Sequence, residues 1–137
     1  MDIEKNLAAI RAALPKGVRL VAVSKHHSVE DVLRAYNAGQ RLFGENTVQE
    51  MTSKYELLPK DIQWHFIGHV QTNKVKYMIP YVSMIQGIDS FKALYEVNKQ
   101  AVKVGRIVDC LLQVHIAAEE TKFGFSPAEC LGMLSAG

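Results

Sequence analysis

The sequence has few cysteines, little net charge and no long apolar run, and each absence argues against a class of protein. Only two of the 137 residues are cysteine, Cys110 and Cys130, and both lie in apolar segments without metal-ligand spacing. We expect them to be buried free thiols of a cytoplasmic protein. The net charge of +2 gives no reason to expect a nucleic acid or an anionic membrane as partner. The apolar runs are strand-length, so none predicts a membrane-spanning helix.

Targeting, phosphate-loop and metal motifs are also missing. The amino terminus begins acidic and amphipathic, unlike a signal peptide. Neither G-x-G-x-x-G nor G-x-x-x-x-G-K-[ST] occurs, which argues against the common nucleotide-binding loops. His65 and His69 are four residues apart, but His65 is predicted on a strand and no acidic ligand stands at metal spacing nearby. Because zinc sites need three or four converging ligands, we expect no metal site.

The composition is that of one globular domain, and helix and strand signals alternate along the chain. Hydrophobic residues make up 48% and charged residues 22%, which suffices for a core. Short apolar runs predict strands at about 18–25, 42–44, 62–68, 82–88 and 109–116. Helical spacing and capping residues predict helices at about 3–14, 29–38, 45–58, 71–79 and 91–104, and a last one from Ser126.

Strict alternation of strands and helices predicts a parallel sheet with helices packed outside it. Two architectures satisfy this pattern, a doubly wound sheet and the front part of a (β/α)8 barrel. A barrel needs eight strands and usually about 250 residues, whereas this chain ends just inside the helix that starts near Ser126. We therefore expect residues 1–137 to be the N-terminal part of a single TIM-barrel domain, with the first five strand–helix units.

The first predicted strand ends on a lysine. The run from Arg19 to Lys25 is dense in valine and leucine, which is typical of a strand buried on both faces of a parallel sheet. Its last residue lies at the carboxyl end of the sheet, where α/β folds place their chemistry. An amine held there against apolar neighbours loses hydration, which favours the neutral nucleophile that forms Schiff bases. The alternative is a surface lysine that happens to follow a strand.

Polar or glycine residues stand at the ends of all five predicted strands. They are, in chain order, Lys25, Glu45, Asn46, His65, Gly68, His69, Asp89, Ser90 and His115. Because the carboxyl ends of parallel strands share one face, such residues form a candidate functional rim. The alternative is that loops are polar anyway, which accounts for Asp89 and Ser90 as a helix cap and for Glu45. It accounts less well for Lys25 and Asn46.

Several motifs together resemble the YggS/PROSC family of pyridoxal phosphate homeostasis proteins. They are Val21-Ala-Val-Ser-Lys25, Phe43-Gly-Glu-Asn46 with Val48-Gln-Glu50, His65-Phe-Ile-Gly68 with Gln71-x-Asn-Lys74, Ile88-Asp-Ser90, and Glu119-Glu-Thr-Lys122 with Gly124-Phe125. They occur in order and at family spacing over essentially the whole chain. The resemblance implies a fold-type III protein like the barrel domain of alanine racemase, with pyridoxal 5′-phosphate (PLP) as cofactor.

The resemblance also implies roles for individual residues. Lys25 holds PLP as a Schiff base, and the other cofactor-binding residues on the rim are Asn46, His65, Gly68 and Ser90. Lys74 belongs to the Q-x-N-K motif, although a solvated lysine in the first turn of a helix explains it equally well. His115 stands where family members often have asparagine. The family's phosphate-binding elements lie in the last third of its chain and are absent here, which leaves open whether PLP binds weakly or not at all.

The implied function is PLP homeostasis, with little or no turnover and no catalytic residue. Reversible storage needs only an amine and an aldehyde, whereas racemisation needs an acid–base pair. Racemases of this fold type take their second base, a tyrosine, from a second domain, and four of the five tyrosines here, Tyr55, Tyr77, Tyr81 and Tyr95, fall on or beside helices. A racemase-like PLP enzyme and a sugar-phosphate barrel enzyme using Lys25 remain alternatives.

Partners follow from the same resemblance. PLP-dependent apoenzymes are the implied recipients of the cofactor, and full-length family members are expected to be monomers. In this chain, open strand edges would expose unpaired backbone groups, which favours self-association.

Overall fold

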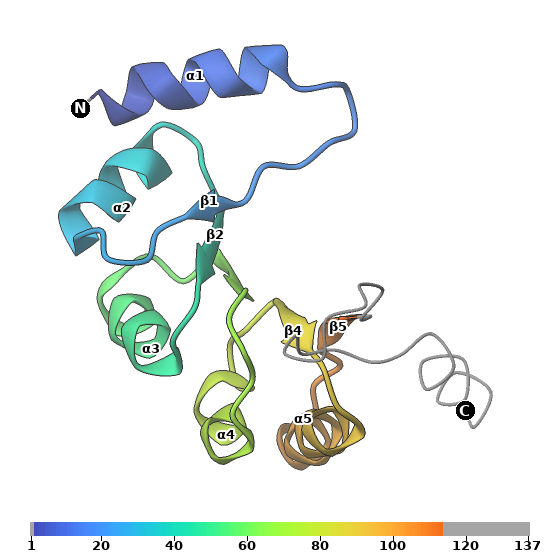
Figure 1. Cartoon of the computed structure of the whole chain (residues 1–137). Helices are drawn as coiled ribbons and strands as arrows, with labels where there is room; N and C mark the ends of the chain where they lie inside the picture. Colours follow the sequence, from blue (N-terminus) through green and yellow to red (C-terminus); the bar gives the residue numbers. More distant parts are fainter. Residues whose placement is uncertain (1, 114–137) are drawn as a thin grey trace.

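The computed structural model describes residues 2–113 (Figure 1). Its elements, in order, are α1 (Ile3–Ala13), β1 (Ala22–Val23), α2 (Val29–Asn37), β2 (Leu42–Glu45), α3 (Val48–Leu57), β3 (Gln63–Phe66), a 3₁₀ turn η1 (Thr72–Lys74), α4 (Val75–Met78), β4 (Met84–Ile88), α5 (Phe91–Val104) and β5 (Asp109–Leu112). The predictions for His115, for Cys130 and for the helix from Ser126 lie outside the described residues.

The five strands form one parallel sheet in the order β1-β2-β3-β4-β5. A doubly wound sheet reverses its strand order at a switch point, whereas a barrel adds each new strand to the same edge. The consecutive order therefore confirms the barrel-type prediction, as an open five-stranded piece. Helices α2 to α5 lie along one side of the curved sheet, and α1 packs against α2 (Figure 1).

Helix ends follow the predicted capping signals. The Ser28 Oγ accepts a hydrogen bond from the Asp31 N–H (3.1 Å), and the Ser90 Oγ accepts one from the Ala93 N–H (3.1 Å). These bonds satisfy backbone donors that have no partner within the helix. Gly105 closes α5 with a φ of 70°, a left-handed conformation that glycine adopts without a Cβ clash. The starts of α2 and α5 and the end of α5 are thus confirmed.

Several element boundaries differ from the predictions, most clearly at β1, at the start of α3 and at η1 with α4. The strand predicted at 18–25 pairs only at Ala22–Val23, and Val18 and Val23 are 53% and 51% exposed, so burial on both faces was wrong. Within the described residues β1 pairs with β2 alone, and the helices cover only one face of the sheet. Glu45 belongs to β2, and α3 starts after its cap Thr47. The helix predicted at 71–79 is the turn η1 followed by the single turn α4.

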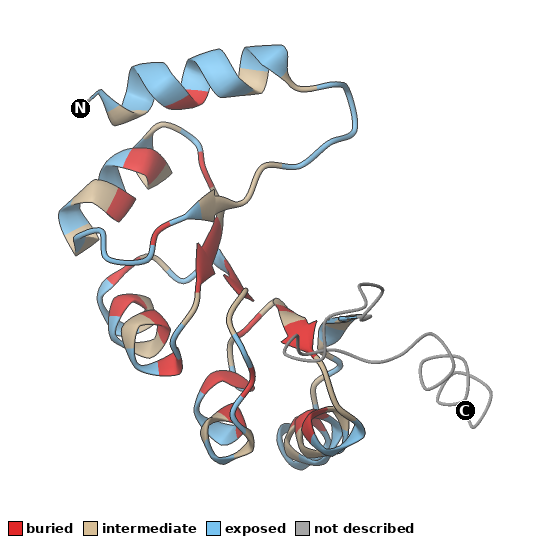
Figure 2. Ribbon diagram, viewed as in Figure 1, coloured by how far each residue is buried: buried red, intermediate tan, exposed pale blue. Residues whose placement is uncertain are grey.

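The core lies between the sheet and its helices, where Figure 2 shows most of the buried segments. On the strands, Phe43, Trp64 and Phe66 are almost fully buried, and the Phe43 and Trp64 rings lie 5.9 Å apart. Met51 and Met78 cover them from α3 and α4 with no exposed surface. Each such side chain contributes about 1.5–3 kcal/mol of hydrophobic stabilisation. The strand ends that form the rim are therefore supported by a core packed between the sheet and its helices.

Cys110 is free, as predicted, but it is only half-buried. It lies on β5, whose outer edge pairs with no other strand in the described part of the chain. Burial still raises the pKa of its thiol, with a smaller contribution from Asp109. Residues 2–113 contain no helix that is both long enough and apolar enough to cross a membrane.

The strands approach one another very closely where β3 and β4 end, and glycine makes this possible. A Cβ built on Gly87 would lie 2.2 Å from the backbone oxygen of Gly68. We predict that Gly87→Ala lowers the free energy of unfolding by about 3 kcal/mol, because backbone must shift to admit the methyl group. The measurement is urea unfolding followed by circular dichroism.

Gly105→Ala serves as the matched control for Gly87→Ala. Nothing lies within 4 Å of a Cβ at Gly105, so only the left-handed backbone is penalised, by about 1–2 kcal/mol. Equal losses of stability in the two variants would contradict the close approach of the strands.

Candidate functional site

The parallel sheet brings four of the five predicted site residues to the carboxyl ends of its strands. Lys25 follows β1, Asn46 follows β2, Gly68 follows β3 and Ser90 follows β4. A Cβ on Gly68 would lie 2.2 Å from the Asn46 carbonyl oxygen, as close as Gly87 comes to Gly68. Asn46 and Gly68 are therefore in direct contact, as a shared rim requires.

A depression of about 550 Å³ lies between the loop after β2 and the loop after β3. Its walls include Asn46, Gly68, His69 and Gln71. The Asn46 Oδ1 atom is buried and has no hydrogen-bond partner among the described residues. A buried acceptor without a donor costs about 1–3 kcal/mol, so a ligand with an N–H or O–H group would be stabilised here.

Lys25 is exposed, and the prediction that it is held among apolar neighbours was wrong. The residue lies two positions beyond β1, in a turn, and not on the strand itself. Side chains of α3 contact the residues on either side of Lys25, but the Lys25 side chain itself is left exposed. The consequence is an amine that is accessible from solvent, at the level of the rim.

His65 lies within β3, opposite Gly44 and Met84, and not at the end of the strand. Its side chain is buried, and the Gln86 Nε2 atom lies 3.0 Å from its Nδ1. Burial, and to a lesser extent Arg19, lowers the pKa of the imidazole. The neutral ring then accepts from Gln86 at Nδ1 and carries its hydrogen on Nε2. His65 thus forms part of the layer beneath the rim.

His69 and Asp89 join the loops that follow β3 and β4. The His69 Nδ1 and Asp89 Oδ2 atoms lie 2.8 Å apart, with His69 half exposed and Asp89 nearly buried. Ser90, beside Asp89, already caps α5 through its hydroxyl oxygen. Lys74 is half-buried and ends the turn η1. Across residues 2–113, no three histidine, cysteine, aspartate or glutamate side chains gather in a way that could hold a metal ion.

Sequence reasoning missed a buried ionic cluster directly beneath Lys25. The Lys54 Nζ atom lies 2.8 Å from the Glu45 Oε2 and 2.9 Å from the Glu50 Oε2. Glu45, interpreted from sequence as a loop residue, is the fully buried last residue of β2, and the Ser24 Oγ donates to its Oε2 at 2.5 Å. The hydrogen bond from Lys54 lowers the pKa of Glu50, with burial opposing it.

A signal for Lys54 was present in the sequence. Val48 and Met51 are buried along one face of α3, and Lys54 falls three residues after Met51 on that face. Helical spacing therefore places a charged side chain in the core, where only a buried partner makes it tolerable.

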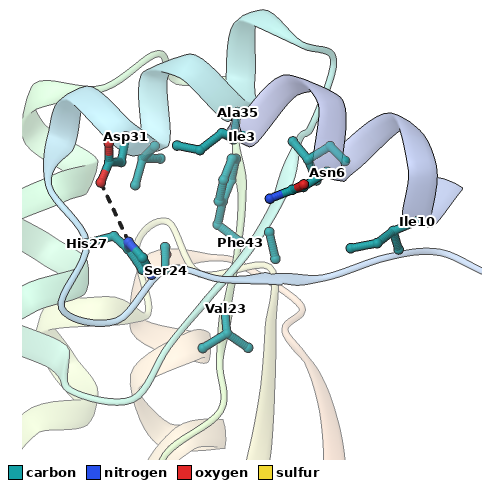
Figure 3. A pocket seen from close by; sticks show the side chains of 12 residues that line it. Ile3, Asn6, Ile10, Val23, Ser24, His27, Asp31, Ala35 and Phe43 are labelled. Atoms are coloured by element: carbon teal, nitrogen blue, oxygen red, sulfur yellow. Dashed lines mark ion pairs between the residues drawn. The ribbon is translucent and has the colours of Figure 1, made fainter. Parts of the chain in front are cut away.

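A second hollow, of about 270 Å³, lies between α1, α2 and β1 (Figure 3). Ile3, Val23 and Phe43 are among its mainly apolar lining residues. Its His27 and Asp31 side chains form an exposed ion pair of 3.6 Å at the edge. This hollow is an apolar gap beneath α1 and does not share the polar character of the rim.

The strand order and the rim define a barrel-type α/β domain of the kind that carries its site at the carboxyl ends of its strands. The chain matches the family described as alanine racemase, N-terminal domain, over residues 1–136, and it belongs to that family.

Curated relatives of the chain include several pyridoxal phosphate homeostasis proteins. That of Schizosaccharomyces pombe is 42% identical over 123 residues, which cover 88% of this chain and 52% of the relative. That of Pasteurella multocida is 37% identical over 146 residues, covering 97% of this chain and 63% of the relative. This chain therefore spans about half to three-fifths of the relatives it matches. The family resemblance inferred from the motifs is confirmed.

Solved structures agree with the fold. PipY of Synechococcus elongatus is 36% identical, and its structures without and with PLP bound give TM-scores of 0.92 and 0.90. Each match covers 98% of this chain and 63% of PipY. The alanine racemase of Clostridium difficile, at 14% identity and a TM-score of 0.79, shares the fold alone.

The buried imidazole of His65 makes stability depend on pH. Because its folded pKa is below the ordinary value of 6.5, the unfolded chain binds more protons once the pH falls below that value. Stability should therefore decline from about pH 6.5 down to the folded pKa. We predict that His65→Gln flattens this part of the profile, measured as urea midpoints between pH 5 and 7.5. An unchanged slope in His65→Gln would contradict the assignment.

The buried cluster gives a further prediction. Lys54→Met leaves Glu45 buried without a counter-charge, so the free energy of unfolding should fall by about 3–5 kcal/mol. Adding Glu45→Gln should recover part of that loss because the deepest unpaired charge is then removed. Lys99→Met, at an exposed position of α5, is the control. The free energy of unfolding is measured by chemical denaturation for the parent chain, the single variant, the double variant and the control. A loss of stability in Lys54→Met no larger than in Lys99→Met would contradict the buried cluster.

Proposed function

We propose that this chain is the PLP-binding part of a pyridoxal phosphate homeostasis protein, with Lys25 holding the cofactor as a Schiff base. The observation that carries the proposal is the likeness to PipY, whose structure has PLP bound and matches this chain with a TM-score of 0.90 at 36% identity. The names of the curated relatives support the same function. Residues 1–137 would then form the N-terminal part of a single barrel domain.

The rim residues fit such a group. PLP supplies an aldehyde, which condenses with a primary amine with loss of water. Lys25 offers an exposed amine. The orphaned Oδ1 of Asn46 offers a buried acceptor beside the depression, and the missing side chain of Gly68 keeps the rim open to the backbone. His65 contributes a neutral ring below the rim, and the Ser90 hydroxyl can still donate while its oxygen caps α5.

The tyrosines support a carrier with little or no turnover. All five, Tyr36, Tyr55, Tyr77, Tyr81 and Tyr95, lie on helices or, for Tyr81, in the turn after α4. The Tyr81 hydroxyl lies 2.8 Å from the Thr52 hydroxyl, and burial raises its pKa to about 12. A tyrosine base must ionise readily, so this shift opposes a racemase role for Tyr81.

We further propose that PLP-dependent apoenzymes receive the cofactor from this protein and that it acts in the cytoplasm.

The test is covalent fixation of PLP. We predict that borohydride reduction of the PLP-treated chain places the cofactor on the peptide containing Lys25, as found by mass spectrometry. Lys25→Ala should abolish this adduct while the cooperative unfolding transition is kept, since an exposed lysine contributes little packing. Lys74→Ala, which removes another motif lysine, is the matched control and should keep the adduct.

Two outcomes would contradict the proposal. One is equal fixation of PLP in Lys25→Ala, and the other is the absence of any adduct in the parent chain. Formation of D-alanine from L-alanine that is lost in Lys25→Ala would instead favour the racemase-like alternative.

A further inference from the structure

The two residues that flank Lys25 are each bonded to a side chain of α3. The Lys54 Nζ donates to the Ser24 carbonyl oxygen at 2.6 Å, just before Lys25. The His26 N–H, just after Lys25, donates to the Glu50 Oε2 at 2.6 Å. Lys54 and Glu50 are themselves joined at 2.9 Å. The short segment around Lys25 is thus held on both sides by one ion pair.

Lys25 and His26 are the central residues of a tight turn. The His27 N–H donates to the Ser24 carbonyl oxygen at 3.0 Å, which closes the turn. His26 has a φ of 65° and is the one non-glycine residue among residues 2–113 with a positive φ. Turns with a positive φ at this position favour glycine or asparagine, and another residue there is strained. Such strain persists only where surrounding contacts determine the conformation.

The charged contacts that hold this turn carry a large desolvation cost. Glu45 has a fully buried side chain, Lys54 is 6% exposed and Glu50 is 24% exposed, so two carboxylates and one ammonium are taken largely out of water. The Glu45 Oε1 has no hydrogen-bond partner in the described chain. Well-packed apolar residues usually give equal or greater stability than a buried ion pair. Stability alone therefore does not account for three charged groups at this place.

We propose that Glu50 and Lys54, supported by Glu45, are positioning residues that fix the backbone around Lys25 and thereby aim its amine at the rim. Lys54 holds the carbonyl before the lysine, and Glu50 holds the strained residue after it. Glu45 keeps the Lys54 ammonium in place from below. None of the three needs to touch a ligand. The inference rests on the proposed function, because it takes Lys25 as the cofactor lysine.

The experiment compares the full chain with Glu50→Ala, Glu50→Gln and Glu56→Ala. Glu56 is an exposed residue of the same helix and serves as the control. Two quantities are measured, the hydrogen-exchange rate of the His26 amide by NMR and the fraction of Lys25 fixed by borohydride at subsaturating PLP. Thermal unfolding and the Trp64 amide report whether the core stays intact.

We expect Glu50→Ala to speed exchange of the His26 amide by about tenfold or more, because the variant loses one charge-assisted hydrogen bond. Fixation of PLP on Lys25 should fall by a similar factor, while the Trp64 amide is unchanged. Glu50→Gln keeps an acceptor of the same shape and should restore most of both quantities. Glu56→Ala should match the parent chain.

A rescue separates positioning from general support of the fold. Glycine adopts a positive φ without strain, so adding His26→Gly to Glu50→Ala should return fixation of Lys25 toward the parental level. Failure of this rescue would overturn the positioning role, as would parental fixation in Glu50→Ala. If the parent chain itself forms no adduct on Lys25, the proposed function has failed and the inference falls with it, which is a distinct result.

Discussion

The parallel pairing of consecutive strands is the constraint on which the rest of the structure depends. Because each strand runs in the same direction, every connection must return the chain across the outside of the sheet, and helices α2 to α5 do so on one side. The same pairing gathers the carboxyl ends of all strands at one rim. Packing and chemistry are therefore separated, with the core on the helical side and the candidate site at the strand ends.

The rim is built from close backbone contacts and a buried charge cluster. Glycine at Gly68 and Gly87 lets successive strands approach until their backbones touch. On the β1 side, the helix α3 sends Lys54 and Glu50 back to the turn that carries Lys25. Helix α3 thus contributes Met51 to the core and polar contacts to the rim, which ties the position of Lys25 to the packing of the domain.

Local signals predicted much of the fold. Ser28, Ser90 and Gly105 act through hydrogen bonds and backbone conformations within a few residues, so the sequence alone could place them. The extent of β1 could not be predicted in this way, because strand length depends on which neighbours pair with it. The proximity of Asn46 and Gly68 could be predicted, because alternating strands and helices imply a parallel sheet whose strand ends share one rim.

The environment of charged residues was harder to predict. Glu45 was interpreted from sequence as a loop residue and Lys54 was given no role on its predicted helix, and their pairing links positions nine residues apart. Lys25 was expected among apolar neighbours, yet it lies in an exposed turn beyond the strand. Helical spacing could have placed Lys54 on the buried face of α3, but its partners and the exposure of Lys25 depend on tertiary neighbours that periodicity does not report.

The most direct test of the central claim is to map PLP binding by amide chemical-shift changes in the isotopically labelled chain. The account predicts changes concentrated at Lys25, Asn46, Gly68 and Ser90, at the carboxyl ends of four strands, with Gly105 at the opposite end unaffected. Changes concentrated in the apolar hollow beneath α1, or at the amino ends of the strands, would contradict it.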